Sequence, residues 1–201
     1  MRWSYRSWRL YCTVYSIIFI FSQLNSYSIE KYSLYCPKQL LLVSEKIMIE
    51  EVGTIETGNN MGEVEKYLLS IGLNGGYSYC AAGQYYSFLK ACKRLNLSEK
   101  SIPIIKTGLA RKVFSNAKKY GKKELANPER HNLIVWRKLG NSRQGHIERV
   151  VKKCKAGWIK TVGFNVKNSD GKEGVAYKKR NIYHISGKLQ VVGIVGFYWE
   201  E

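Results

Sequence analysis

The sequence is poor in proline and histidine, and it lacks the cysteine spacing of a zinc site. Three prolines among 201 residues leave no proline-rich linker, and no internal repeat or low-complexity tract is present. The three histidines do not cluster and no CxxC occurs, so neither a metal nor a cofactor is predicted. A chain of this length with 45% hydrophobic residues supports one folded domain rather than two.

Acidic residues are scarce as well. There are 15 of them against 33 lysines and arginines, which gives a formal charge of +18 at pH 7. A field of this sign favours polyanionic partners, namely nucleic acid, anionic lipid head groups or anionic cell-wall polymer. The charge by itself excludes none of the three.

The chain also lacks a hydrophobic run of the length that a transmembrane helix needs. The apolar segment Val14–Phe21 is short, and it follows three arginines and no acidic residue. This layout is typical of a secretory signal peptide, which we expect over residues 1–28, with an uncleaved N-terminal anchor as the alternative. Either reading predicts an exported protein of the periplasm or cell envelope, or a secreted one. Membrane contact is expected only through an uncleaved N-terminus.

Five cysteines in an exported chain raise the question of disulfides. Cys12 lies in the predicted leader. Cys80 and Cys92 are expected on one helix, about 18 Å apart along its axis, which is far beyond the roughly 7 Å that a bridge allows between Cα atoms. Pairing among Cys36, Cys92 and Cys154 stays open.

Helical patterns come first along the chain and strand patterns second. Residues 29–46 give no clear signal and are interpreted as a lead-in to a domain over 47–201. Apolar residues recur at helical spacing over 60–71, from Cys80 to about Cys92, and over 108–120. Strand-like runs separated by Gly, Asn and Ser clusters follow at 132–136, 146–152, 158–162, 175–179 and 191–199. This order predicts an α+β fold with helices packed on a mostly antiparallel sheet.

The start of the second helix has the properties of a nucleophile site. Cys80 opens this helix, where the partial positive charge of the N-terminus favours a thiolate and free N–H groups can hold an oxyanion. The alternative is a buried structural cysteine. The turn before it supplies residues next to the thiol, and we predict substrate binding by Gly76, Tyr77, Ser78 and Tyr79.

A histidine and an asparagine are the candidate partners of the thiol. His146 follows a polar turn and begins a strand-like run, so its ring can act as general base from a sheet end. Asn165 ends the next run and could orient the ring, although a turn asparagine is an equally good reading. His131, in a polar loop, and His184, near a turn, are weaker candidates.

Four motifs occur in a recognisable order, at residues 57–68 (TGNNMGEVEKYL), 76–82 (GYSYCAA), 145–147 (GHI) and 161–165 (TVGFN). Together they resemble the CHAP branch of the NlpC/P60 superfamily, over about residues 47–197. The resemblance implies a papain-like fold and peptidoglycan amidase or endopeptidase activity. It also implies that Cys80 is the nucleophile, His146 the base and Asn165 a polar member of the site.

The sequence departs from this family at one important position. The family's usual glutamate corresponds to Gly163, which leaves Asn165 alone to orient the imidazole. Glu148 falls on the same strand face as His146, so substitution for the missing carboxylate is the alternative role for it. A carboxylate in such a run is most often solvated, and we therefore expect Glu148 at the surface.

Three hypotheses follow. The leading one is a papain-like cysteine hydrolase that cleaves peptidoglycan through an acyl-enzyme, with peptidoglycan or another anionic envelope polymer as partner. The glycine at position 163 favours, as an alternative, an inactive relative that binds cell wall or a partner protein. The net charge keeps a nucleic-acid-binding protein as a further alternative, which the predicted leader disfavours.

Overall fold

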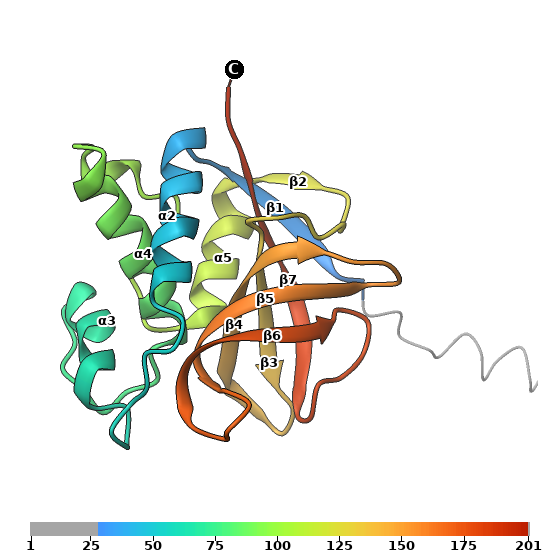
Figure 1. Cartoon of the computed structure of the whole chain (residues 1–201). Coiled ribbons are helices and arrows are strands. Elements are labelled where there is room, and N and C mark those ends of the chain that lie inside the picture. Colours follow the sequence, from blue (N-terminus) through green and yellow to red (C-terminus); the bar gives the residue numbers. More distant parts are fainter. Residues whose placement is uncertain (1–27, 201) are drawn as a thin grey trace, which may run out of the picture.

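The computed structural model describes residues 28–200, except for the side chains of residues 142 and 143. Residues 1–27 of the predicted leader lie outside it. The described helices are α2 (Lys38–Glu50), α3 (Glu65–Ser70), α4 (Cys80–Arg94) and α5 (Ala110–Tyr120), with short 3-10 turns at Gly62–Val64 and Glu99–Ser101. Among the residues described, no helix is long and apolar enough to cross a membrane. Figure 1 shows the helices gathered on one side of the sheet.

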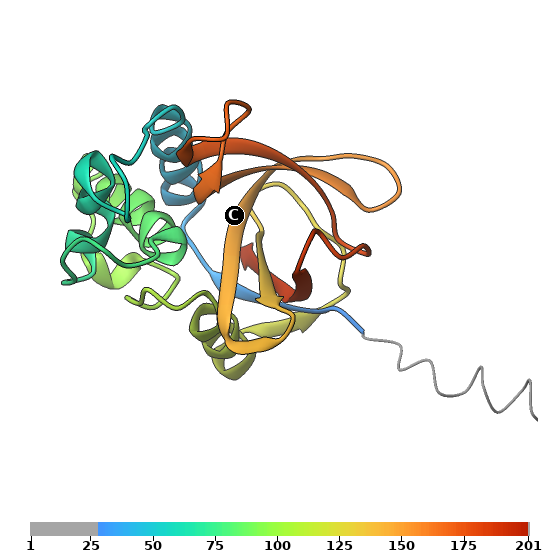
Figure 2. The same cartoon turned by 90° about the horizontal axis from the view of Figure 1, so that it is seen from below.

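The seven strands form one sheet in the order β2-β1-β7-β3-β4-β5-β6. Only the β1–β7 pair is parallel. Figure 2 shows that the sheet curls strongly, so its face away from the helices is concave. The seven strands are β1 Glu30–Tyr35, β2 Lys122–Glu124, β3 Leu133–Lys138, β4 Asn141–Lys153, β5 Trp158–Lys167, β6 Glu173–Asn181 and β7 Leu189–Tyr198.

The predicted α+β class, with helices packed on a mostly antiparallel sheet, is confirmed. The interpretation of residues 29–46 as a lead-in is wrong, because they form β1 and most of α2. β1 pairs with β2 and β7 inside the sheet, and α2 packs beside α4. The short strand β1 is recognised only through partners that lie about a hundred residues or more away in the sequence.

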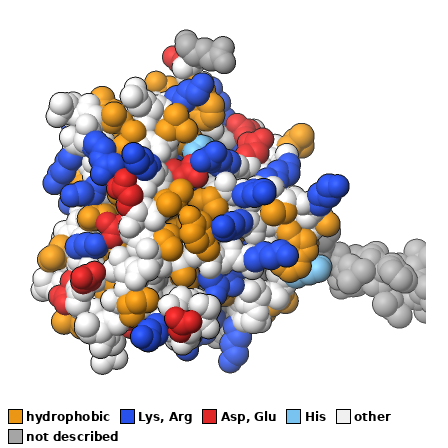
Figure 3. Space-filling model, viewed as in Figure 1, with side chains coloured by type: hydrophobic (Ala, Val, Ile, Leu, Met, Phe, Trp, Pro, Cys, Tyr) orange, Lys and Arg blue, Asp and Glu red, His pale blue; other side chains and the backbone are white. Residues whose placement is uncertain are grey.

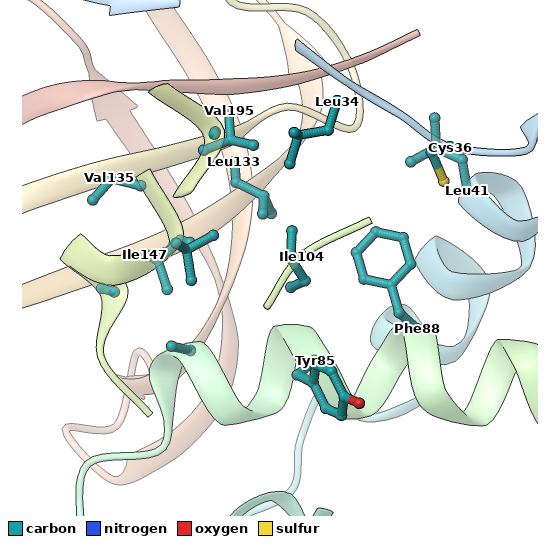
Figure 4. Packing of buried hydrophobic residues seen from close by; sticks show 14 of the residues in the cluster. Leu34, Cys36, Leu41, Tyr85, Phe88, Ile104, Leu133, Val135, Ile147 and Val195 are labelled. Atoms are coloured by element: carbon teal, nitrogen blue, oxygen red, sulfur yellow. The ribbon is translucent and has the colours of Figure 1, made fainter. Parts of the chain in front are cut away.

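The helices pack on the sheet through a continuous apolar core. Figure 4 shows Tyr85 and Phe88 of α4 among side chains from β1, β3 and β4, including Leu34, Leu133 and Ile147. A second cluster fills the concave side of the sheet and contains Ile134, Trp136, Val150, Ile159, Ile182, Val191 and Ile194. The first cluster holds α4 against the sheet, and the second fills the space enclosed by the curled sheet.

Gly83 allows α4 to lie directly against β5. A Cβ atom at this position would lie 2.2 Å from Cγ of Phe164, which is far inside normal contact. Phe164 is fully buried and also packs against the Tyr67 ring, at 4.8 Å between centroids, so it has little room to move. The absence of a side chain at Gly83 therefore sets the distance between the start of α4 and the sheet.

Replacing Gly83 by alanine is expected to lower the free energy of unfolding by about 1–3 kcal/mol, because the added methyl group overpacks the contact with Phe164. Urea denaturation of the purified protein measures this. Gly108→Ala is the matched control, since its Cβ would meet its nearest neighbour at an ordinary 3.4 Å. Equal stability of the two variants would show that α4 does not depend on this close approach.

Candidate active site

Cys80 is the first residue of α4 and its side chain is nearly buried, with the residue 3% exposed. The first backbone hydrogen bond at the N-terminal end of α4 is donated by the N–H of Gly83 to Tyr79 O, at 2.8 Å. The N–H groups of residues 80–82 precede this bond and have no intrahelical partner, as at any helix start. The thiol therefore lies beside unpaired donors at the positive end of a helix.

His146 lies on β4 and faces Cys80. Cys80 and His146 line the same cleft, and the Cys80 side chain is one of the groups that raise the pKa of the imidazole. His146 Nε2 lies 2.9 Å from Oε1 of Glu148. Because Nε2 is occupied by Glu148, Nδ1 is the nitrogen left for the thiol. Strand alternation explains the contact between His146 and Glu148, because these residues are two apart on β4 and therefore share its concave face.

Glu148 is completely buried, so the expectation that it lies at the surface is wrong. Its Oε2 accepts a hydrogen bond from Thr161 Oγ1 at 2.5 Å, and its Oε1 accepts one from Arg180 Nη2 at 2.5 Å. Arg180 Nη1 in turn donates to Ser186 Oγ at 3.0 Å. A hydroxyl from β5 and a guanidinium from β6, the next two strands of the sheet, thus compensate the charge that burial would otherwise disfavour.

The space that Glu148 occupies exists because the cross-strand residue is a glycine. Glu148 and Gly163 are direct partners in the β4–β5 register. A Cβ atom at Gly163 would lie 2.9 Å from Cγ of Glu148 and 2.9 Å from Cγ1 of Val166. The bare backbone at Gly163 therefore leaves room for the Glu148 carboxylate beside the imidazole.

The pair has shifted pKa values that favour its charged form. Burial lowers the pKa of His146, but the hydrogen bonds to Cys80 and Glu148 outweigh burial and raise it to about 9. Burial raises the pKa of Glu148, whereas its contacts with His146 and Arg180 outweigh burial and lower it to about 2. Both shifts favour the pair of an imidazolium and a carboxylate at neutral pH.

The prediction that Asn165 orients His146 is not supported by its contacts. Asn165 Nδ2 donates to Asn60 Oδ1 at 2.9 Å and to Glu173 Oε1 at 3.0 Å. The β5–β6 register shifts between residues 164 and 166, and Asn165 has a φ of 59°, so it sits in a bulge. The bulge turns the amide toward the 57–61 loop, while Asn165 still lines the cleft described below.

The four turn residues predicted to bind substrate fall into two groups. Ser78 lines the cleft, whereas Gly76 and Tyr77 are exposed on the turn. The prediction is wrong for the Tyr79 side chain, which is fully buried and donates its hydroxyl hydrogen to Glu56 Oε2 at 3.2 Å. The Tyr79 ring packs against the Tyr67 ring, so Tyr79 holds the turn to the core and does not contact a ligand.

The other two histidines lie away from the thiol. His131 Nδ1 lies 2.5 Å from Oε2 of Glu45 of α2, and Arg130 binds the same carboxylate. His184 is exposed in the loop before β7. The four described cysteines are free, and within residues 28–200 no three His, Cys, Asp or Glu side chains gather to hold a metal ion.

An open cleft of about 1150 Å³ gives access to the pair. Cys80 and His146 line it together with Ser78, Asn165 and residues at the start of α5. In such an arrangement a thiol can act as a nucleophile and an imidazole can carry a proton, while a buried carboxylate fixes the ring. The cleft makes the thiol and the imidazole reachable from solvent. Comparisons with protein-family models, with curated proteins and with solved structures returned no match.

Proposed function

We propose that this protein is a papain-like cysteine hydrolase of the CHAP type that cleaves amide bonds in peptidoglycan. The observation that carries the proposal is that Cys80 and His146 line one cleft while the buried Glu148 carboxylate holds the His146 ring. A carboxylate that holds one ring nitrogen fixes the orientation of the imidazole and stabilises its protonated form.

In the proposed reaction, the proton of the Cys80 thiol is already held by His146 as the imidazolium, and the Cys80 thiolate attacks the carbonyl carbon of the substrate amide. The first-turn N–H groups of α4 stabilise the negative oxygen that forms. The amine then leaves with the proton from the imidazolium, and a thioester remains on Cys80. Water attacks this thioester, His146 accepts its proton, and release of the carboxylic acid regenerates the enzyme.

The structure also bears on the glutamate that the CHAP resemblance expects at Gly163. Glu148 and Gly163 are cross-strand partners, so a carboxylate from either position would reach the same space beside His146. We infer that the orienting carboxylate has moved from β5 to β4 in this chain. The glycine at position 163 favours an inactive relative only if no other carboxylate reaches His146. Glu148 supplies such a carboxylate, so it weakens that alternative.

The basic surface supports an anionic envelope polymer as the substrate, in agreement with the resemblance to the CHAP branch. Figure 3 shows lysine and arginine side chains spread over one face, with few acidic ones between them. Several lysines lie over aromatic rings, as Lys160 does over Tyr177 at 4.0 Å and Lys179 over Trp158 at 5.0 Å. Such a face attracts an anionic envelope polymer and raises its concentration near the cleft.

The test is incubation of the purified protein with isolated peptidoglycan, with the soluble products identified by mass spectrometry. We expect fragments with new amine and carboxyl ends, whose masses show whether the amide next to the sugar or one within the stem peptide is cut. A folded protein that releases no fragments would contradict the proposal. If that same protein binds DNA tightly at physiological salt, the nucleic-acid-binding alternative takes its place.

A further inference from the structure

The two sides of the cleft differ in charge. β4 carries His146 and lies between β3 and β5 in the sheet. On the β3 side the cleft is lined by Lys138 at the end of β3 and by Arg111 and Lys112 at the start of α5. On the β5–β6 side it is lined by Asn165 and by the Glu173 carboxylate, which accepts from Asn165.

The cationic side is built against the catalytic strand. A Cβ atom at Gly145, the residue before His146, would lie 3.1 Å from Cγ of Arg111, so the absence of a side chain there lets the arginine stem pack onto β4. The α5 helix starts at the same place without a side-chain cap, and its N-terminus adds partial positive charge.

Among the described residues, the two lysines on this side of the cleft have no counter-ion. None of the ion pairs between described residues includes Lys112 or Lys138. A neighbouring hollow of about 450 Å³ shares Arg111 and Lys138 with the cleft and adds Arg137, and no acidic residue lines it. Positive charge therefore continues from the thiol outward over the β3–β4 hairpin.

We infer that this side of the cleft is a binding site for the carboxylates of an acidic peptide arm, next to the amide that is cut. Lysines without an ion-pair partner, such as Lys112 and Lys138, attract anionic groups more strongly in a concave site than on an open surface. The opposite side, with its Glu173 carboxylate, fits an amine or amide donor. The inference rests on the proposed function and specifies its substrate: a peptide with free carboxylates is bound in preference to its amidated form.

The experiment separates binding from turnover. Two dye-labelled peptides are compared, Ala-Glu-Lys-Ala with free carboxylates and Ala-Gln-Lys-Ala with an amidated C-terminus. Their affinities for the Cys80→Ala protein are measured by fluorescence anisotropy at low salt. We expect the acidic peptide to bind about tenfold more tightly, as one or two partly exposed charge contacts would give.

Charge reversal locates the effect. Lys112→Glu combined with Lys138→Glu is expected to abolish the preference for the acidic peptide. The control is Lys152→Glu combined with Lys155→Glu, which changes the net charge equally at exposed residues near the far end of β4 and should keep the preference. Equal affinity for both peptides, or the same loss in both double variants, would overturn the inference.

Turnover by the unmodified protein distinguishes the two proposals. If it cleaves the acidic and the amidated peptide with the same kcat/KM, the hydrolase proposal stands and the carboxylate site is wrong. If the Cys80→Ala protein discriminates between the peptides but the unmodified protein cleaves neither these peptides nor peptidoglycan, the carboxylate site stands and the hydrolase proposal fails.

Discussion

Replacing Cys80 by alanine is expected to lower kcat on peptidoglycan by about a thousandfold or more, which is the scale seen when a catalytic nucleophile is removed. The reason is positional: Cys80 is the cysteine that lines the cleft, whereas Cys36 and Cys92 are buried in the core between helices and sheet. The alanine variant should remain folded, because only the small thiol group is removed. The measurement is the rate of release of soluble fragments, with circular dichroism to verify the fold.

Cys154→Ala is the control for this substitution. Cys154 is a free and partly exposed cysteine in the turn between β4 and β5, at the other end of β4 from His146. Its loss should leave the rate unchanged. Activity retained in Cys80→Ala, or lost equally in Cys154→Ala, would rule out Cys80 as the nucleophile.

Replacing Glu148 by alanine is expected to lower kcat by about a hundredfold or more, because the imidazole loses the group that orients it. The same change should cost about 3–5 kcal/mol of stability, since it leaves the Arg180 guanidinium in the concave face without its carboxylate partner. Glu148→Gln keeps the shape of the side chain but not its charge, so it separates the loss of charge from the loss of packing.

The pH dependence distinguishes an orienting carboxylate from a merely structural one. The pKa of His146 is raised to about 9 from a usual 6.5, so the stability it contributes is complete below about pH 6.5 and is lost as the pH rises through about 9. The pKa of Glu148 is lowered to about 2 from 4.5, so its contribution is complete above about pH 4.5 and is lost as the pH falls through about 2.

The reaction needs the imidazolium as proton donor, so the rate of the unmodified protein should fall as the pH rises through about 9. Without the Glu148 carboxylate the imidazolium is less stable, and this alkaline limb should move to lower pH in Glu148→Gln. A transposed variant, Glu148→Ala with Gly163→Glu, should recover about tenfold of the lost kcat, because the two positions are cross-strand partners. An unmoved alkaline limb in Glu148→Gln, with no recovery in the transposed variant, would show that Glu148 has only a structural role.

The sequence predicts those parts of the site that depend on local structure. A cysteine at a helix start behind a glycine turn and a histidine at the beginning of a strand-like run are local patterns. The structure places Cys80 at the first position of α4, as predicted, and His146 on β4, which begins earlier than predicted, at Asn141. The helices α3, α4 and α5 and the strands β3 to β7 were likewise predictable from periodicity, whereas α2 was not. β4 and β5 extend further than their apolar runs because their polar residues pair with neighbouring strands.

The remaining site residues depend on contacts that periodicity does not carry. Glu148 reads as a surface residue until the register places it opposite Gly163 and brings Arg180 of β6 to its carboxylate. Asn165 reads as a partner of the histidine until a bulge turns its amide toward Asn60. In both cases the missing signal is the pairing of a strand with a distant segment.

The sequence by itself therefore determined the α+β class, the place of the thiol at the start of α4 and the place of the imidazole on β4, because helix periodicity, strand alternation and turn chemistry act over a few residues. Only the tertiary structure decided which carboxylate meets the imidazole, that residues 30–50 belong to the domain, and that the cations of α5 and β3 share one cleft with Cys80. These features depend on strand register and on the curl of the sheet, which are set by packing between segments far apart in the chain.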